Sequence, residues 1–167
     1  MLICDFKNHL IRSANLHSRQ VKHIVGVPGL RGQDKLGGKL PGNLQQIASP
    51  WDIVQAPRGI FLIAMAGLHQ IWSLDLGRDR CGLYSGSSRE GNLNSTHTRT
   101  TWAQPSGLTI GQLNNEPVLF VADSESSSVR AVGLESRRTL PVVGATADEN
   151  DLFAFGDTDG QGYSARL

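Results

Sequence analysis

Three segments of this chain align with one another without a gap. They are CDFKNHLIRSANL (4–16), AMAGLHQIWSLDL (64–76) and ADSESSSVRAVGL (122–134), whose starts lie 60 and 58 residues apart. Each segment begins with a small residue, carries a β-branched residue at its eighth position and ends on leucine. This self-similarity constrains the fold more than any other feature, because every copy must form the same supersecondary unit. We therefore expect an array of similar units.

The pattern predicts four β-strands in each unit. Apolar runs, IFLIA (60–64) and VLFVA (118–122), precede the second and third copies, and a polar turn and a second strand follow, as in a β-hairpin. A glycine-closed strand comes next, and a proline-marked strand begins the following unit. No stretch keeps helical periodicity over ten residues. Strands that are apolar on both faces favour sheets stacked against sheets, so the pattern predicts an all-β fold of the β-propeller type.

The repeat divides the chain into units at approximately 1–46, 47–101 and 102–167. We expect about three four-stranded blades, whereas closed propellers have 4–8. The register of the proline-marked strands places both ends of the chain inside blades. The expected architecture is therefore a partial propeller, incomplete at both ends.

Specific motifs point to a family. DFKNHLIR (5–12) contains Asn8-His9-Leu10, the tripeptide that gives NHL repeats their name, and SPWDIV (49–54), GSSREGNLN (86–94), VADSESSSVRAV (121–132) and NDLFAFGDTDGQG (150–162) extend the match. The chain thus resembles the NHL-repeat β-propeller family. The members to which it is most similar have a thioredoxin-like domain before the propeller. The resemblance implies further blades and such a domain in a full-length protein, but this chain has no cysteine motif of its own for a redox role.

Composition excludes several classes of protein. The net charge is +1, so composition predicts no dedicated nucleic-acid or membrane surface. Cys4 and Cys81 form no C-x-x-C motif. The longest apolar run, residues 60–68, is far shorter than the ~20 residues that span a bilayer, and no signal peptide precedes it. We expect a protein of the reducing cytoplasm.

No catalytic, cofactor-binding or metal site is expected. His9 and His69 share the sixth position of the repeat, where the third copy has Ser127, so a structural role at a turn is the simpler interpretation. DTDGQG (157–162) resembles the start of a calcium loop but lacks the later glutamate. LRGQDKLGGKL (30–40) lacks the G-K-[ST] of a phosphate loop, and G-x-S-x-G is absent.

Arg12, Trp72 and Arg130 share the ninth position of the repeat. Arginine and tryptophan are favoured anchors in protein interfaces, so these residues are candidates for partner binding on one part of the propeller. The alternative is that they pack between blades, with the arginine stems covering apolar neighbours.

The resemblance implies a non-enzymatic scaffold that presents loops to protein partners of unknown identity, without a cofactor or a membrane. Two alternatives stay open. One is an RNA-binding propeller, whose basic face would draw on Arg12, Lys22, Arg130, Arg137 and Arg138, although the near-neutral net charge counts against it. The other is a lyase-type propeller with a metal ion on its central axis.

Overall fold

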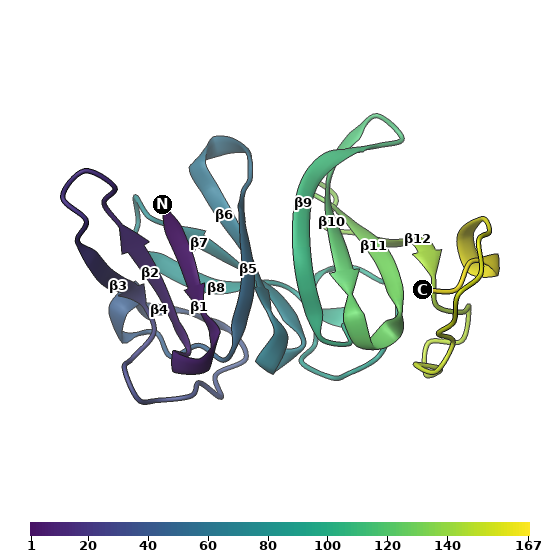
Figure 1. Ribbon diagram of the computed structural model, residues 1–167, viewed down its shortest axis with the longest axis horizontal. Helices are drawn as coiled ribbons and strands as arrows, with labels where there is room; N and C mark the ends of the chain where they lie inside the picture. Colours follow the sequence, from purple (N-terminus) through teal and green to yellow (C-terminus); the bar gives the residue numbers. More distant parts are fainter.

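The computed structural model describes residues 1–167, and its three antiparallel sheets stand side by side along the long axis of the molecule (Figure 1). The first sheet contains β1 (Leu2–Asp5), β2 (Leu10–Ala14) and β3 (Val21–Val25) in that order. The middle sheet has the order β4-β8-β7-β6-β5, from β4 (Gly37–Pro41), β5 (Pro50–Gln55), β6 (Ile60–Met65), β7 (Gln70–Asp75) and β8 (Arg80–Ser85). The third sheet has the order β12-β11-β10-β9, from β9 (Pro105–Leu113), β10 (Glu116–Asp123), β11 (Ser128–Gly133) and β12 (Thr139–Gly144).

The helices are short 3-10 turns between the strands. They are η1 (Phe6–Asn8), η2 (Gly42–Leu44), η3 (Pro57–Gly59), η4 (Ala66–Leu68), η5 (His97–Arg99), η6 (Ser124–Ser126) and η7 (Gly162–Ser164). None of them has the length and apolar character that crossing a membrane requires. The all-β, propeller-type fold expected from the repeat is confirmed.

The sheets have three, five and four strands rather than four each. The extra strand of the middle sheet, β4, comes from a glycine-rich stretch for which no strand was expected, and it pairs with β8. Glycine makes this approach possible: a Cβ on Gly37 would lie 2.6 Å from the Trp72 ring, and one on Gly82 would lie 2.8 Å from the backbone nitrogen of Gly38. Although β4 precedes residue 47, it therefore hydrogen-bonds into the second unit.

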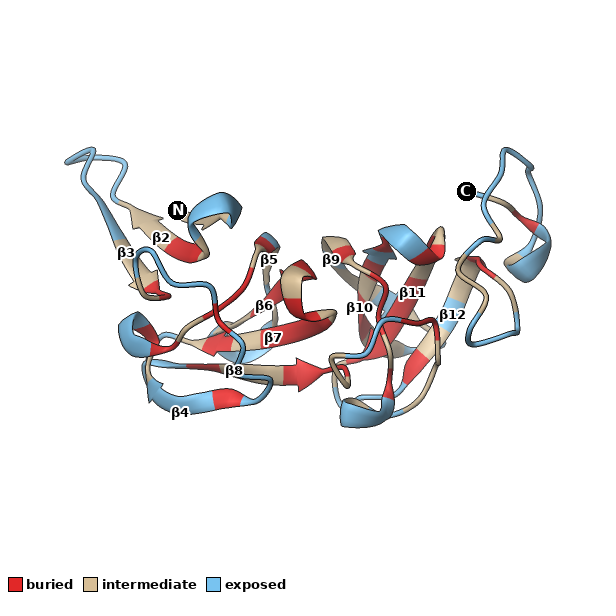
Figure 2. Cartoon of the chain, turned by 90° about the horizontal axis from the view of Figure 1, so that it is seen from below, coloured by how far each residue is buried: buried red, intermediate tan, exposed pale blue.

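Two hydrophobic cores fill the spaces between neighbouring sheets. The first joins the first and middle sheets and includes Ile11, Ile63 and Trp72, while the second joins the middle and third sheets and includes Leu62 and Trp102. Neighbouring residues of β6 thus enter different cores, because successive side chains of a strand point to opposite faces. This explains why β6 is apolar throughout. Buried residues concentrate in β6, β7, β10 and β11, whereas the β2–β3 loop and the strandless segment 145–167 are largely exposed (Figure 2).

Candidate functional site

The repeated hairpins share one corner geometry. The short turns η1, η4 and η6 follow β1, β6 and β10, and the residue that ends each of them is left-handed: His9 (φ 56°), His69 (φ 51°) and Ser127 (φ 49°). Left-handed backbone disfavours most L-residues, and histidine is enriched there. A glycine at or just after the end of the strand that follows each hairpin (β3, β8 or β12) packs against the carbonyl of the corner residue; Gly86, for example, would place a Cβ 2.9 Å from the His69 oxygen. The residue at the sixth position of the repeat must therefore adopt a left-handed backbone conformation.

Both corner histidines also bridge to the next blade. Nδ1 of His9 accepts the Ser49 backbone N–H at 3.0 Å, and Nδ1 of His69 accepts the Gln104 N–H at 3.3 Å. Ser49 and Gln104 each precede the proline that begins a strand of the next blade, β5 or β9, and both are left-handed themselves. This geometry fits the structural interpretation of the two histidines.

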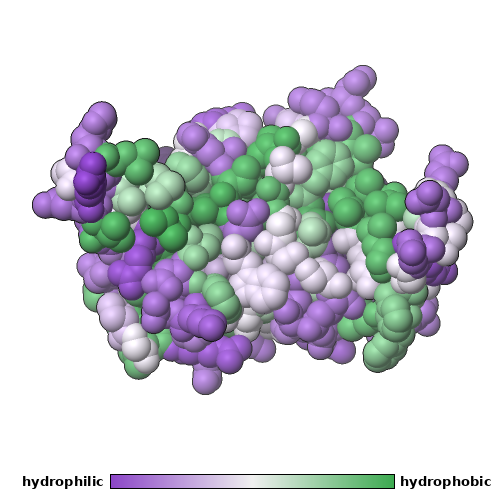
Figure 3. All heavy atoms as spheres, in the orientation of Figure 1, coloured by the Kyte–Doolittle hydropathy of each residue, from purple (hydrophilic) through white to green (hydrophobic).

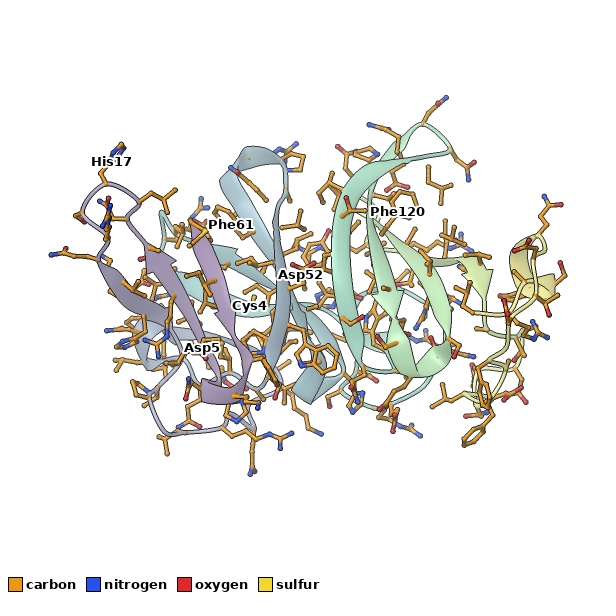
Figure 4. The ribbon with its side chains drawn as sticks, in the orientation of Figure 1. Cys4, Asp5, His17, Asp52, Phe61 and Phe120 are labelled. Atoms are coloured by element: carbon orange, nitrogen blue, oxygen red, sulfur yellow. The ribbon has the colours of Figure 1, made fainter.

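The second and ninth positions of the repeat lie on neighbouring strands, two residues out of direct register, so they are diagonal neighbours in each blade. In the first blade, Nε of Arg12 lies 2.6 Å from the carboxylate of Asp5, and both side chains remain partly exposed. In the third blade, Nη1 of Arg130 lies 2.8 Å from Asp123, and both are buried. Figure 4 shows Asp5 at the end of β1, beside Cys4, which faces β5 and Asp52.

Arg130 and Asp123 form the centre of a buried polar network. Arg130 also donates to the carbonyls of Leu93 and Thr101 and to Asn94, and its guanidinium stacks 4.3 Å from the centre of the Trp102 ring. Every nitrogen of the guanidinium thus has an acceptor, as burying this charge requires.

Asp123 accepts from the Ala103 N–H and from Ser126 Oγ as well as from Arg130. Burial raises the pKa of Asp123, while the Arg130 charge and the donated hydrogen bonds act in the opposite direction. Burial also disfavours the charged form of Arg130, and for this basic group it lowers the pKa. The network fixes the 86–104 connection onto the third blade.

In the middle blade an apolar pair, Met65 and Trp72, replaces the ion pair. Both residues are fully buried. The indole Nε1 donates to Gln70 Oε1 at 2.8 Å, and Gln70 Nε2 donates to the carbonyls of Lys35 and Gly86. The Gln70 amide thus holds the connection before the middle blade through Lys35, whereas the Arg130 guanidinium holds the connection before the third blade.

These contacts place the three partner-binding candidates at equivalent positions but not on a common surface. Trp72 is 0% exposed and Arg130 is 1% exposed, so the expectation that they are exposed anchors is wrong. Packing and polar satisfaction between blades account for both, as the alternative interpretation had it. Only Arg12 keeps accessible side-chain surface, 32% of its maximum.

The basic residues named for an RNA-binding face do not gather either. Arg130 is interior, whereas Arg137 and Arg138 lie in the exposed β11–β12 turn, at the other end of β11 from the η6 corner. Lys22 is exposed on β3 of the first sheet. The structure also contains no group of three His, Cys, Asp or Glu side chains arranged to hold a metal ion.

An exposed aromatic cluster is the feature that sequence reasoning missed. Phe6 of η1 and Trp51 of β5 are 45% and 43% exposed, and their rings meet edge to face at 6.2 Å. Nζ of Lys7 lies 5.9 Å from the centre of the Phe6 ring. We call Phe6, Lys7 and Trp51 the aromatic patch; it spans the first two blades at their η1 and η4 corners (Figure 1). In the space-filling view, hydrophobic residues also extend across the upper half of this side of the molecule (Figure 3).

A signal for the patch existed in the repeat alignment. Phe6 aligns with Ala66 and Ser124, and Trp51 follows its proline where Ser106 follows the next one. Large aromatic residues therefore stand where the other copies have small ones.

Comparisons with known proteins identify relatives along the whole chain, although no family model matches it. The chain is 41% identical over 184 aligned residues to NHL repeat-containing protein 2 of Homo sapiens and of Bos taurus, covering 99% of this chain and 25% of those proteins. It is 39% identical to the protein SUPPRESSOR OF QUENCHING 1, chloroplastic, of Arabidopsis thaliana, over 100% of this chain and 16% of that protein. The chain thus spans about a quarter or less of the length of these relatives.

Solved structures support the fold. An auxiliary nutrient binding protein from Bacteroides ovatus superimposes with a TM-score of 0.66 at 15% identity, covering 97% of this chain and 36% of that one. A protein from Bacteroides thetaiotaomicron gives 0.61 at 17% identity over 92% of this chain and 36% of that one. At these identities the likeness concerns architecture alone. The expected resemblance to NHL-repeat propellers is confirmed by the sequence relatives.

Proposed function

Because the chain is related over nearly its whole length to NHL repeat-containing protein 2, we propose that it is a non-enzymatic propeller segment whose corner turns bind a protein partner. The aromatic patch carries this proposal. It is the place where two neighbouring corners present large aromatic side chains to solvent and a lysine lies beside them. Protein interfaces are enriched in aromatic residues, and their energetic centres favour tryptophan.

The patch is held in place before any partner arrives. His9, at the end of η1, accepts a hydrogen bond from Ser49, two residues before Trp51, so the turn bearing Phe6 and the strand bearing Trp51 are tied together. The edge-to-face contact of the rings stabilises the same arrangement. A preorganised surface loses little conformational entropy on binding, which favours recognition by a rigid scaffold.

The setting we propose is the cytoplasm. Both cysteines are free thiols, which fits a reducing compartment. In a full-length protein we propose that these blades are accompanied by further blades and by a thioredoxin-like domain, because the relatives are about four times as long as this chain. The partner would then meet a larger propeller in which the aromatic patch is one contact region.

Site-specific photo-crosslinking tests the proposal. Benzoylphenylalanine is introduced in place of Phe6 and, as the control, in place of Leu16, which is 69% exposed and outside the patch. In cell extract we expect discrete protein adducts from position 6 that are absent from position 16 and are lost when Trp51→Ala is added. Adducts that disappear on ribonuclease treatment would instead assign the patch to RNA. The same adduct pattern from both positions would refute a specific protein-binding surface.

A further inference from the structure

A cavity of about 370 Å³ opens between the middle and third blades. It lies beside the β5–β6 and β11–β12 turns, at the opposite end of the blades from the aromatic patch (Figure 1). Its walls come from both sheets, so it exists only where the two blades pack together. Its residues are Ala56, Pro57, Arg58, Ile60, Leu62, Ser73, Tyr84, Pro117, Leu134, Glu135 and Arg137. Ligand sites begin at about this size, so the cavity suits a small molecule or the end of a chain.

The inner wall of the cavity is apolar and fixed. Leu62 and Tyr84 are buried, and Ile60 and Leu134 are half-buried beside them. The Tyr84 hydroxyl donates to the Leu134 carbonyl at 3.1 Å, which joins the middle blade to the third across the cavity. Burial raises the pKa of Tyr84, so the phenol stays neutral and adds no negative charge to the wall.

The rim carries two guanidinium groups and one carboxylate. Arg58 and Arg137 take part in none of the three ion pairs of the protein and donate no side-chain hydrogen bond within it. The guanidinium of Arg137 is nevertheless positioned, because it stacks 4.8 Å from the centre of the Tyr84 ring. With Glu135 included, the rim carries one excess positive charge.

Both arginines sit on turns with defined backbones. Arg58 (φ 63°) and Arg137 (φ 53°) are left-handed, and the N–H of Arg137 donates to the Gly133 carbonyl at 2.9 Å. Their stems therefore start from fixed points on opposite blades. A planar guanidinium presents parallel N–H groups that match the two oxygens of a carboxylate.

We propose that this inter-blade cavity binds a singly charged carboxylate with a branched aliphatic body. The carboxylate lies between Arg58 and Arg137, and the aliphatic body packs against Ile60, Leu62 and Pro117. One negative charge complements the rim, whereas Glu135 opposes a more highly charged anion. A free aliphatic acid and a peptide ending in leucine share this chemistry. The site is separate from the aromatic patch and does not depend on the proposed protein-binding function.

Amide NMR titration of the full chain tests the proposal. The probes are 4-methylpentanoate, the matched amine 4-methylpentan-1-amine, and acetyl-Gly-Gly-Leu with either a free or an amidated C-terminus. We expect saturable shifts of the Leu134 and Arg137 amides with both acids and none with the amine or the amide. Tighter binding of the peptide acid would identify a peptide terminus as the ligand, and tighter binding of 4-methylpentanoate would identify a free acid; either supports the site.

Variants distinguish the rim from general positive charge. The double variant Arg58→Gln/Arg137→Gln should weaken binding of the acids by at least about tenfold, because charge-assisted hydrogen bonds are the stronger class. Arg138→Gln is the control: it removes the neighbouring exposed arginine, which does not line the cavity, and should leave the affinity unchanged. Equal losses in the two variants, equal binding of acid and amine, or the absence of saturable shifts would overturn the assignment.

Discussion

The buried pair Asp123–Arg130 predicts a large response to a single substitution. The two side chains are essentially inaccessible, and the ion pair spans 2.8 Å. Asp123→Met introduces the residue that occupies this repeat position in the middle blade, where Met65 packs in the core. In the third blade it leaves the Arg130 guanidinium in the interior without a counter-charge and the Ala103 N–H without its acceptor. The substitution thus keeps a side chain that suits the fold and removes the counter-charge of Arg130 together with the carboxylate acceptor of the Ala103 N–H.

The first blade supplies the matched comparison. Asp5 occupies the same position and lies 2.6 Å from Arg12, but the arginine and aspartate side chains are 32% and 23% exposed. Removing one partner of a buried pair costs about 3–5 kcal/mol, whereas exposed pairs contribute about 0–1 kcal/mol. We expect the free energy of unfolding to fall by about 3–5 kcal/mol for Asp123→Met and by at most about 1 kcal/mol for Asp5→Met.

The middle blade also suggests how the loss is repaired. There Trp72 and Gln70 stand where the third blade has Arg130 and Ser128. Gln70 Nε2 donates to the Lys35 carbonyl in the preceding connection and to the Gly86 carbonyl just after β8. Adding Ser128→Gln and Arg130→Trp to Asp123→Met removes the unpaired guanidinium charge and supplies a glutamine amide as a hydrogen-bond donor. Coupling between contacting residues amounts to about 0.5–3 kcal/mol, so the triple variant should be more stable than Asp123→Met alone by about 1–3 kcal/mol.

Urea unfolding followed by far-ultraviolet circular dichroism measures these differences, since this signal reports the loss of backbone structure, whereas tryptophan fluorescence would change directly with the added indole. The slope of free energy against urea should stay constant across the series, so that shifts in midpoint report stability. Equal losses for Asp123→Met and Asp5→Met would refute the importance of burial. A triple variant less stable than Asp123→Met would refute the exchange of the ion pair for the apolar pair.

Three further outcomes follow from the geometry. Gly144→Ala should destabilise the chain more than Gly29→Ala in the same urea assay, because both glycines have φ near +80° but only the first would drive a Cβ into a backbone carbonyl; equal losses would contradict this. Burial raises the pKa of both cysteine thiols to about 12, so Ellman's reagent at pH 8 should react slowly until urea is added, and immediate reaction of the native chain would disprove it. Hydrogen bonding from Arg12 holds the pKa of Asp5 below its ordinary value, so the pair stabilises the fold above about pH 4 and its contribution is lost as the pH falls through the lowered pKa. In a carboxyl NMR titration, Arg12→Met should raise the Asp5 midpoint, and an unchanged midpoint would contradict the pairing.

The repeat made the hairpins predictable but not their environments. Every blade needs the same hairpin backbone. The apolar runs, the left-handed corner residue and the glycine of the following strand therefore recur, and each lies where the alignment predicts it. Equivalence of position does not fix exposure. The Arg130 side chain is enclosed by the carbonyls of Leu93 and Thr101, whereas the Arg12 guanidinium bonds to Asp5 alone. These surroundings come from connections outside the repeat, so the alignment contained no information about them.

Strand β4 was missed for a related reason. Its residues, Gly37–Pro41, alternate in no way that marks a strand, and glycine and proline weaken strand propensity. The strand forms because a glycine on each side allows its backbone to approach Trp72 and β8 closely. Such a pairing depends on a tertiary contact that the local sequence does not encode.

Where this chain has a larger apolar residue than the other copies of the repeat, that residue is either buried or exposed. The neighbouring residues decide which of the two occurs. Trp72 departs together with Met65, its diagonal neighbour on the adjacent strand, and Gly37 supplies the space against its ring, so the change is compensated and the indole is buried. Phe6 and Trp51 depart at corner positions where small residues suffice elsewhere, and no neighbouring change encloses them. A compensated departure serves packing. An uncompensated one leaves apolar surface in water at a cost of roughly 25 cal/mol per Å², which is why the aromatic patch, and not the ninth position of the repeat, is the better candidate for binding a partner.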